Sequence, residues 1–354
     1  MYELTIEPIG QTIEVDEGQT MLDAALRQGV WLPHACCHGL CATCKVDVTD
    51  GLVEHNDASP FALLDYERDE GMTLACCATL ESDCTIEADI EEDPDQEVIP
   101  VEDYAATVSR IEDLTPTIKG IFLKLDRPMH FQAGQYINIE LPNEAGDGTV
   151  HRAFSLANPP STGDEVELNV RIVAGGYGTG YIHNELSEGD EVTISGPYGR
   201  FFVRKSADMP MIFFAGGSGL SSPKSMIDEL LEEGCEQPIT LVYGQRTRAE
   251  LYYHEAFTKL AEQHDNFSYV PALSEEPEDS DWDGYRGFVH DAARAHFNDR
   301  FTGHKAYLCG PPRMIDATIT ALMQGRLFEK DIYLEKFVSA ADADQIKSPL
   351  FRKI

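Results

Sequence analysis

The chain has 354 residues, of which 42% are hydrophobic and 25% charged, so it is long enough for two or three globular domains, and we expect three. Its apolar runs stay well short of the roughly 20 residues of a membrane span, and the opening MYELTIEPIG lacks the blocks of a secretory signal, which predicts no membrane association and a cytoplasmic location. A formal net charge of −35 excludes nucleic acid as a partner, because its phosphates would be repelled.

Residues 1–92 predict a small α+β domain. Alternating apolar residues on either side of Gly10 indicate a β-hairpin. A helix is predicted over residues 21–28, with Thr20 as its N-cap and Gly29 at its end. The other expected elements are strands, at residues 45–48 and 85–90.

This first part of the chain is also strongly acidic. From Met1 to Ser109 the only basic residues are Arg27, Lys45 and Arg68. The acidity has two interpretations that the sequence leaves open. It serves solubility or adaptation to high salt, or it provides a negative field for docking a partner.

Seven of the nine cysteines lie in the first quarter of the chain, which predicts a local metal or redox site. Cys36, Cys41 and Cys44 have the spacing CxxxxCxxC, and Cys76 follows later, which is the plant-type ligation pattern of a 2Fe-2S cluster. A zinc site with four cysteines is the alternative, although structural zinc usually takes two short CxxC-like knuckles. Spacing alone does not exclude Cys77 in place of Cys76.

The rest of the chain divides by composition and periodicity. An acidic, proline-containing linker comes first, and a block of short strands and turns that predicts an antiparallel β-barrel follows. The next block alternates apolar strands with amphipathic helices, which predicts a doubly wound parallel sheet. A tail without a functional signal ends the chain. The four segments are residues 93–103, 104–205, 206–337 and 338–354.

In the third block, the strand MIFFAGG leads into SSPKSMIDELLEEG. Here Ser222 is the predicted N-cap, Pro223 fits the first helical turn and Gly234 ends the helix. Further helices are predicted near residues 254–264 and 291–297.

HRAFSLAN, at residues 151–158, resembles the RxYS signature of the ferredoxin reductase superfamily. The resemblance implies that Arg152 pairs with the pyrophosphate of FAD, that Phe154 stacks on the isoalloxazine ring and that Ser155 faces its N5. VRIVAGGYGTGYI is similar to the second phosphate segment of that superfamily. It supplies the remaining predicted FAD contacts of this block, Arg171, Gly178 and Thr179.

AGGSGLSSP and LCGPPRM resemble the two nicotinamide segments of the same superfamily. The resemblance implies NAD contacts at Gly216, Gly217, Ser218, Gly219, Cys309, Gly310 and Pro311, with Cys309 near the reacting nicotinamide carbon. LEKF resembles the end of the final strand, which implies that Glu335 lies near the flavin N5 and that Phe337 covers the flavin. YGQRTRAELYY resembles the NADH-using branch and adds Gly244 and Arg246. A 2′-phosphate on Arg246 and Arg248 remains the alternative.

The order of ferredoxin, flavin barrel and nicotinamide domain resembles the reductase components of bacterial multicomponent oxygenases. Segments such as ASPFALLDYERDE, FQAGQY, GFVHDAA and LMQGRLFE are similar to the phenol hydroxylase reductases. The implied function is a reductase that passes electrons from NADH through FAD and a β-grasp 2Fe-2S domain to a di-iron hydroxylase, in brief encounters. The alternatives are the reductase of a Rieske dioxygenase and a noncatalytic redox sensor.

Overall fold

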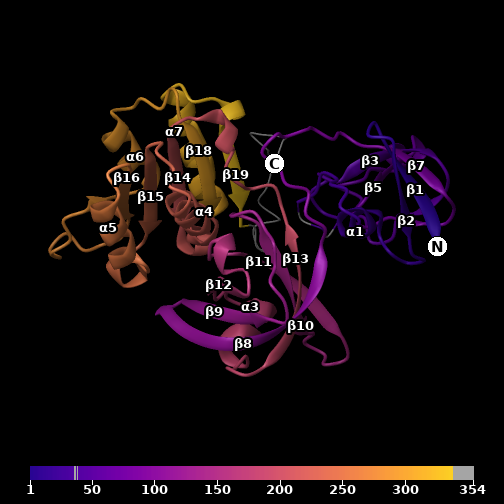
Figure 1. Cartoon of the computed structure of the whole chain (residues 1–354), viewed down its shortest axis with the longest axis horizontal. Helices are drawn as coiled ribbons and strands as arrows, with labels where there is room; N and C mark the ends of the chain where they lie inside the picture. Colours follow the sequence, from indigo (N-terminus) through magenta and orange to yellow (C-terminus); the bar gives the residue numbers. More distant parts are fainter. Residues whose placement is uncertain (36, 38, 338–354) are drawn as a thin grey trace. The chain divides into compact units, whose positions relative to one another are not determined.

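The computed structural model describes residues 1–35, 37 and 39–337, which form two compact units (Figure 1). Unit 1 spans Met1–Glu102, and unit 2 begins at Asp103. The predicted tail and the predicted ligand Cys36 lie outside the described residues. Within the described part of the chain, no helix has the length and apolar character needed to cross a membrane.

Unit 1 is built on a five-stranded sheet in the order β2-β1-β7-β3-β5. Strand β1 pairs antiparallel with β2 and parallel with β7, so the first and last strands of the sheet in sequence are neighbours, as in a β-grasp fold. The strands of this sheet are β1 (Tyr2–Glu7), β2 (Gln11–Val15), β3 (Lys45–Asp50), β5 (Met72–Leu74) and β7 (Cys84–Glu87). The other elements are the β4 (Val53–Glu54) and β6 (Thr79–Leu80) pair and helices α1 (Met21–Arg27) and α2 (Asp65–Asp69).

Most local predictions for unit 1 are confirmed, but the strand expected at residues 85–90 is β7, Cys84–Glu87, and ends three residues earlier. Gly10 has a positive φ in the turn between β1 and β2. The hydroxyl of Thr20 accepts a hydrogen bond from the backbone N–H of Asp23 and so caps α1, and Gly29 follows the helix with a φ of +70°. The apolar face of α1 and the inward residues of β1 and β2 are buried, which gives this unit its own core.

The segment predicted as a linker, residues 93–103, has no helix or strand before β8 starts at Glu102. Near its end, Val101 is buried and its N–H donates to the carbonyl of Leu26 at 3.0 Å. The end of the segment is thus anchored on unit 1.

The first part of unit 2 is a six-stranded sheet in the order β11-β10-β13-β8-β9-β12. A bridge between Leu156 and Leu168 joins its two edge strands, so the sheet closes on itself as a barrel. Inward-facing residues such as Val108, Leu123, Ile139 and Leu168 fill it. The elements are β8 (Glu102–Thr115), β9 (Ile118–Leu125), β10 (Tyr136–Pro142), β11 (Thr149–Ser155), β12 (Glu165–Arg171), β13 (Glu191–Tyr198) and helix α3 (Tyr177–Asn184).

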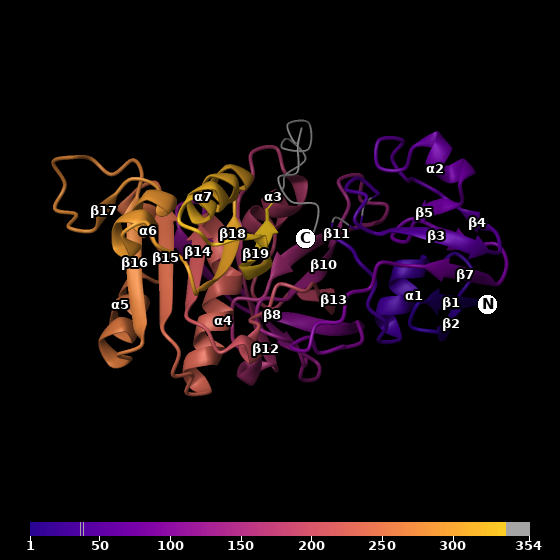
Figure 2. The same cartoon turned by 90° about the horizontal axis from the view of Figure 1, so that it is seen from above.

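The second part of unit 2 is a parallel sheet in the order β17-β16-β15-β14-β18-β19, with helices on both faces (Figures 1 and 2). Alternate residues of β14 explain the two faces: Phe213 packs in one core with α4 and α5, and Phe214 packs in the other with α6 and α7. The strands are β14 (Met211–Gly216), β15 (Ile239–Gln245), β16 (Phe267–Leu273), β17 (Tyr285–Arg286), β18 (Lys305–Gly310) and β19 (Ile332–Lys336). The helices are α4 (Ser221–Glu232), α5 (His254–Gln263), α6 (Val289–Phe297) and α7 (Pro312–Gln324).

Candidate functional site

Three polar side chains from three separate segments of unit 2 meet at the carboxylate of Glu335 in β19. The hydroxyl of Ser155, at the end of β11, donates to Glu335 Oε2 at 3.0 Å, and the hydroxyl of Ser222 in α4 donates to the same oxygen at 3.1 Å. The thiol of Cys309, near the end of β18, lies 3.6 Å from that oxygen. The structure therefore brings together Ser155, Cys309 and Glu335, the three residues predicted to be catalytic.

The surroundings of this cluster shift its protonation equilibria. Burial raises the pKa of Glu335, and hydrogen bonds from Ser155, Ser222 and Cys309 oppose that shift. Burial, followed by the negative charge of Glu335, raises the pKa of the Cys309 thiol well above its ordinary value. The thiol therefore stays protonated near neutral pH and serves as a donor.

The prediction that Ser222 caps α4 is wrong. Helix α4 begins at Ser221, its N-cap position is Leu220, and no side chain caps it. Ser222 lies within the first turn, and its hydroxyl reaches the carboxylate of Glu335, 113 positions away. A serine before a proline at a helix start reads as a cap, so the sequence carried no local signal for this contact.

The predicted nicotinamide segments meet at the switch point of the parallel sheet. Strand order runs one way from β14 and the other way from β18, and ligands of such sheets bind in the crevice at the carboxyl ends of these strands. A Cβ on Gly219 would lie 2.5 Å from the carbonyl oxygen of Cys309 and 2.6 Å from the Cα of Gly310. Glycine at 219 is thus required for the two segments to touch.

Other predicted nicotinamide residues are explained by packing. A Cβ on Gly244 would lie 2.4 Å from Val289 Cγ1, so the glycine lets α6 approach β15. A Cβ on Gly216 would lie 2.4 Å from the sulfur of Met314 in α7. Gly217, Ser218 and Pro311 lie in the same two turns, at the ends of β14 and β18.

The predicted FAD residues gather around β11, β12 and α3. The side chain of Arg152 covers Gly178, because a Cβ on that glycine would lie 2.7 Å from Arg152 Cγ. The hydroxyl of Thr179 accepts from the backbone N–H of Val173 at 3.1 Å, which holds the turn before α3. Arg171, at the end of β12, places its guanidinium 3.2 Å from the Cβ position of Gly217, so it lies between the predicted flavin and nicotinamide segments.

The two predicted flavin-facing aromatic residues lie on different elements. Phe154 is in β11, paired with Ile137, and is partly buried. Phe337 follows β19, and its N–H donates to the carbonyl of Gly310 at 3.0 Å. The second aromatic is therefore tied to the predicted nicotinamide turn.

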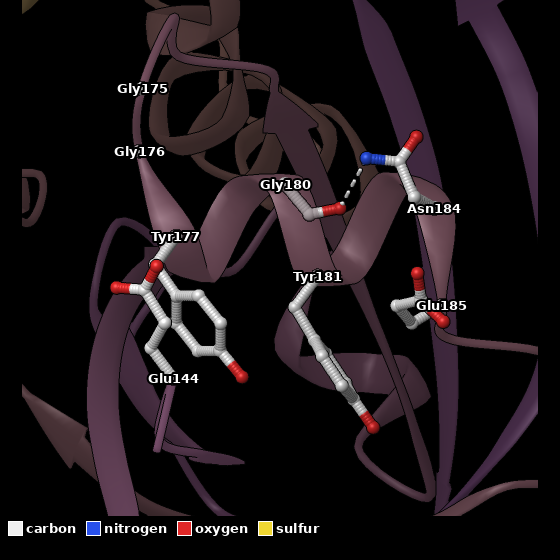
Figure 3. Close-up of a pocket in the computed structure, with 8 residues that line it drawn as sticks. All are labelled: Glu144, Gly175, Gly176, Tyr177, Gly180, Tyr181, Asn184 and Glu185. Carbon is white, nitrogen blue, oxygen red and sulfur yellow. Dashed lines mark hydrogen bonds between the residues drawn. The ribbon is translucent and has the colours of Figure 1, made fainter. Parts of the chain in front are cut away.

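A hollow lies beside the predicted second phosphate segment (Figure 3). Tyr177 and Tyr181 of α3 point to the same side of the helix, with ring centroids 6.3 Å apart. The lining includes the acids Glu144 and Glu185 and no basic residue.

Both arginines considered for a 2′-phosphate are paired with acids. The guanidinium of Arg246 forms two hydrogen bonds to the carboxylate of Glu250, one of them at 3.0 Å. Arg248 pairs with Asp281 at 2.9 Å, and its backbone N–H donates to Glu276 at 2.8 Å. These acids offset the charge that a 2′-phosphate would need, which favours NADH over NADPH.

A buried charged network joins the barrel to the parallel-sheet part. Lys224 of α4 forms ion pairs with Glu167 of β12 and with Asp228, each at 3.2 Å, and donates to the carbonyl of Ala157 at 2.9 Å. The hydroxyl of Tyr253 donates to Glu167 at 2.6 Å. Burial tends to lower the pKa of Lys224, but the two carboxylates outweigh it and leave the pKa raised.

In unit 1, three described cysteines of the predicted cluster site, Cys41, Cys44 and Cys76, interact with one another electrostatically. A hydrogen bond with Cys44 lowers the pKa of Cys76 to about 6, against the effect of burial and with help from the backbone N–H of Gly39. The charge of Cys41 tends to raise the pKa of both Cys44 and Cys76. Among the described residues no three potential ligands gather around a single metal ion, and Cys36 lies outside them.

The chemistry of this donor set fits a 2Fe-2S cluster. Thiolates are its ligands, and backbone N–H groups directed at the sulfurs tune it. Gly39 has a φ of +69°, and a Cβ there would lie 2.7 Å from Cys77 Sγ, so only glycine allows this approach. The Sγ atoms of Cys76 and Cys77 lie 3.6 Å apart, and burial, followed by the charge of Cys76, raises the pKa of Cys77 to about 12.

Three family models match successive parts of the chain. A 2Fe-2S iron-sulfur cluster binding domain matches residues 4–81, an oxidoreductase FAD-binding domain matches 105–203 and an oxidoreductase NAD-binding domain matches 213–320. These matches confirm the predicted fold class and the predicted cofactors.

Named relatives match over all or nearly all of the chain. The chain is 62% identical to the reductase component of phenol 2-monooxygenase from Pseudomonas sp. (strain CF600), over 100% of this chain and 99% of that protein. It is 34% identical to the reductase component of propane 2-monooxygenase from Rhodococcus jostii, covering 96% and 92%. The crystal structure of the Amycolatopsis cytochrome P450 reductase GcoB superposes with a TM-score of 0.85 at 34% identity, covering 95% of this chain and 99% of that one.

Proposed function

Because this chain belongs to the family of reductase components of bacterial multicomponent oxygenases, we propose that it supplies electrons from NADH to the hydroxylase of a phenol monooxygenase. The observation that carries the proposal is the meeting of Ser155, Cys309 and Glu335 at the junction of the barrel and the parallel sheet. FAD, when bound, accepts two electrons as hydride and gives them up one at a time, as the one-electron 2Fe-2S cluster requires.

In this proposal the residues of the junction position the reacting groups. Ser155 and Cys309 present an O–H and a protonated S–H, and Glu335 exchanges a proton beside them. Phe154 supplies the flavin-facing aromatic, and Phe337 covers the same site from the nicotinamide turn. We assign Arg152 and Arg171 to the FAD phosphates, since a guanidinium forms paired hydrogen bonds to phosphate oxygens.

We assign the cluster to Cys36, Cys41, Cys44 and Cys76. The spacing CxxxxCxxC supports Cys36, Cys41 and Cys44, and the hydrogen bond between the thiols of Cys44 and Cys76 brings Cys76 to this loop. The choice of Cys76 over Cys77 follows from the resemblance to plant-type ferredoxins.

We propose that the hydroxylase contact is transient. A strongly acidic chain steers a partner of opposite charge and lets it leave quickly, and the same charge disfavours nucleic acid and anionic lipid. The pairing of Arg246 with Glu250 supports NADH as the donor.

The test is the Cys41→Ser variant in an anaerobic NADH titration followed by absorbance and electron paramagnetic resonance. The wild type is expected to show flavin reduction and a reduced-cluster signal. The variant should lose the cluster signal and all cytochrome c reduction while it keeps NADH-ferricyanide activity, because its flavin site in unit 2 is intact. Cytochrome c reduction that survives without the cluster would refute the proposed electron order.

A further inference from the structure

Unit 1 exposes three large apolar side chains within one short segment, residues 55–70, besides others such as Leu40 and Leu52 elsewhere on its surface. Phe61 is 92% exposed, and Tyr66 and Leu64 are 58% and 40% exposed. An aromatic ring held almost wholly in water is unfavourable for an isolated domain, and a gathering of such side chains marks a contact surface. Part of this segment, ASPFALLDYERDE, resembles the phenol hydroxylase reductases, but it contains no residue that is assigned to a cofactor.

The segment has a fixed conformation. Ala62 and Leu63 are buried, and the N–H groups of both donate to the carbonyl of Ser59 at 3.0 and 2.9 Å. The guanidinium of Arg68 donates to the carbonyl of Ala58 at 3.0 Å. Phe61 is therefore turned outward by a folded turn, with its neighbours anchored in the core.

The same segment is joined directly to the two cysteine loops. The N–H of Ser59 donates to the carbonyl of Gly39 at 3.1 Å, and the side-chain amide of Asn56 donates to the carbonyl of Cys77 at 2.9 Å. Gly39 lies between Cys36 and Cys41, and Cys77 follows Cys76. The exposed apolar residues are thus only a few residues from the atoms that buttress the proposed cluster.

The charge around these residues is negative. Asp57, Asp65, Asp69 and Glu70 are exposed in the same segment. The three basic side chains of residues 1–109 all bond within unit 1: Arg27 to Asp23, Lys45 to Glu67 and Arg68 to Ala58. The segment at residues 55–70 therefore carries both exposed apolar and exposed acidic side chains.

We propose that this docking face, formed by Phe61, Leu64, Tyr66, Asp57, Asp65 and Asp69, is where the oxygenase component receives electrons. This inference rests on the proposed function. The partner surface that fits it is an apolar depression bordered by lysine or arginine side chains. The acids steer the encounter, and the aromatic centre excludes water from the contact beside the cluster.

The experiment compares full-length Phe61→Ser with wild type and with Phe328→Ser, a matched control at a 55% exposed phenylalanine of unit 2. Two quantities are measured: the KM for the purified phenol hydroxylase component in coupled product formation, and the rate of cluster reduction by NADH in anaerobic stopped-flow. We expect the KM of Phe61→Ser to rise at least about tenfold, the size of a binding hot spot of about 1.4 kcal/mol. Cluster reduction should be unchanged, and Phe328→Ser should match wild type in both.

A second variant tests the acidic residues of the docking face. Asp65→Asn combined with Asp69→Asn should weaken coupling at low ionic strength, and the difference should disappear at high salt. An unchanged KM in Phe61→Ser would overturn the proposal. Slower cluster reduction would also overturn it, because the face would then serve contact within the chain. If wild-type reductase fails to support hydroxylation at all, the proposed function fails instead.

Discussion

Lys224 holds the two parts of unit 2 together, so its replacement should loosen the junction at which hydride transfer is proposed. Its ammonium group lies between the carboxylates of Glu167 and Asp228 and bonds to a carbonyl of the barrel. Lys224→Met keeps the packing of the aliphatic stem and removes only the charge. Two buried carboxylates then face each other without their cation.

The expected cost is about 3–5 kcal/mol, the range for breaking a buried ion pair from one side. For a unit of this size it corresponds to a fall in melting temperature of roughly 6 to 20 °C. The direction of the pKa shift determines how the contribution of Lys224 to stability changes with pH. In wild type the raised pKa of Lys224 gives stability that is fully present below about 10.5 and is lost as the pH rises through the higher folded value.

In the variant the deficit should shrink on acidification, because burial already raises the pKa of Asp228 and protonation removes its charge. The assay is thermal unfolding of unit 2, followed by flavin release, from pH 5 to 9. Lys124→Met is the control, because its ion pair with Asp164 is more than half exposed and should contribute at most about 1 kcal/mol. Equal shifts for the two variants would refute this account of the network.

Two further changes test the nicotinamide side. Ser222→Ala removes one of the donors that lower the pKa of Glu335, so the acid limb of the pH profile for hydride transfer should move to higher pH and the rate should fall roughly three- to tenfold, the effect of one hydrogen bond. The rate of flavin reduction in stopped-flow, recorded across pH, measures both effects. An acid limb at the same pH as in wild type would contradict the contact between Ser222 and Glu335. Glu250→Gln releases Arg246, so kcat/KM with NADPH should rise about tenfold while the value with NADH stays near wild type. No gain with NADPH would mean that Arg246 does not face the ribose.

Much of the fold could be predicted from the sequence, because its signals are local. The hairpin around Gly10, the Thr20 cap and the strand-helix alternation after residue 206 each depend on neighbours within a few positions. The cysteine spacing is local in the same sense. The close packing that requires a glycine at 219 could be predicted only through the family resemblance of its segment.

The contacts that define the candidate site were beyond such reasoning. Ser155 and Glu335 are 180 positions apart, and nothing in either segment encodes the other. The misassigned cap at Ser222 has the same cause. The pair of Arg246 and Glu250 is different, because its four-residue spacing was readable in YGQRTRAE. A pair of opposite charges four residues apart is a local signal for such an ion pair.

The burial of Cys309 has a consequence for chemical resistance. Reduced flavoproteins that meet oxygen release peroxide, and thiolates are the forms that peroxide and alkylating reagents attack. Cys309 has no exposed surface and a raised pKa, whereas Cys37 of unit 1, which is not assigned to the cluster, is partly exposed. Inactivation by such reagents should therefore begin in the ferredoxin unit and leave the nicotinamide half able to oxidise NADH long after electrons have stopped reaching the oxygenase.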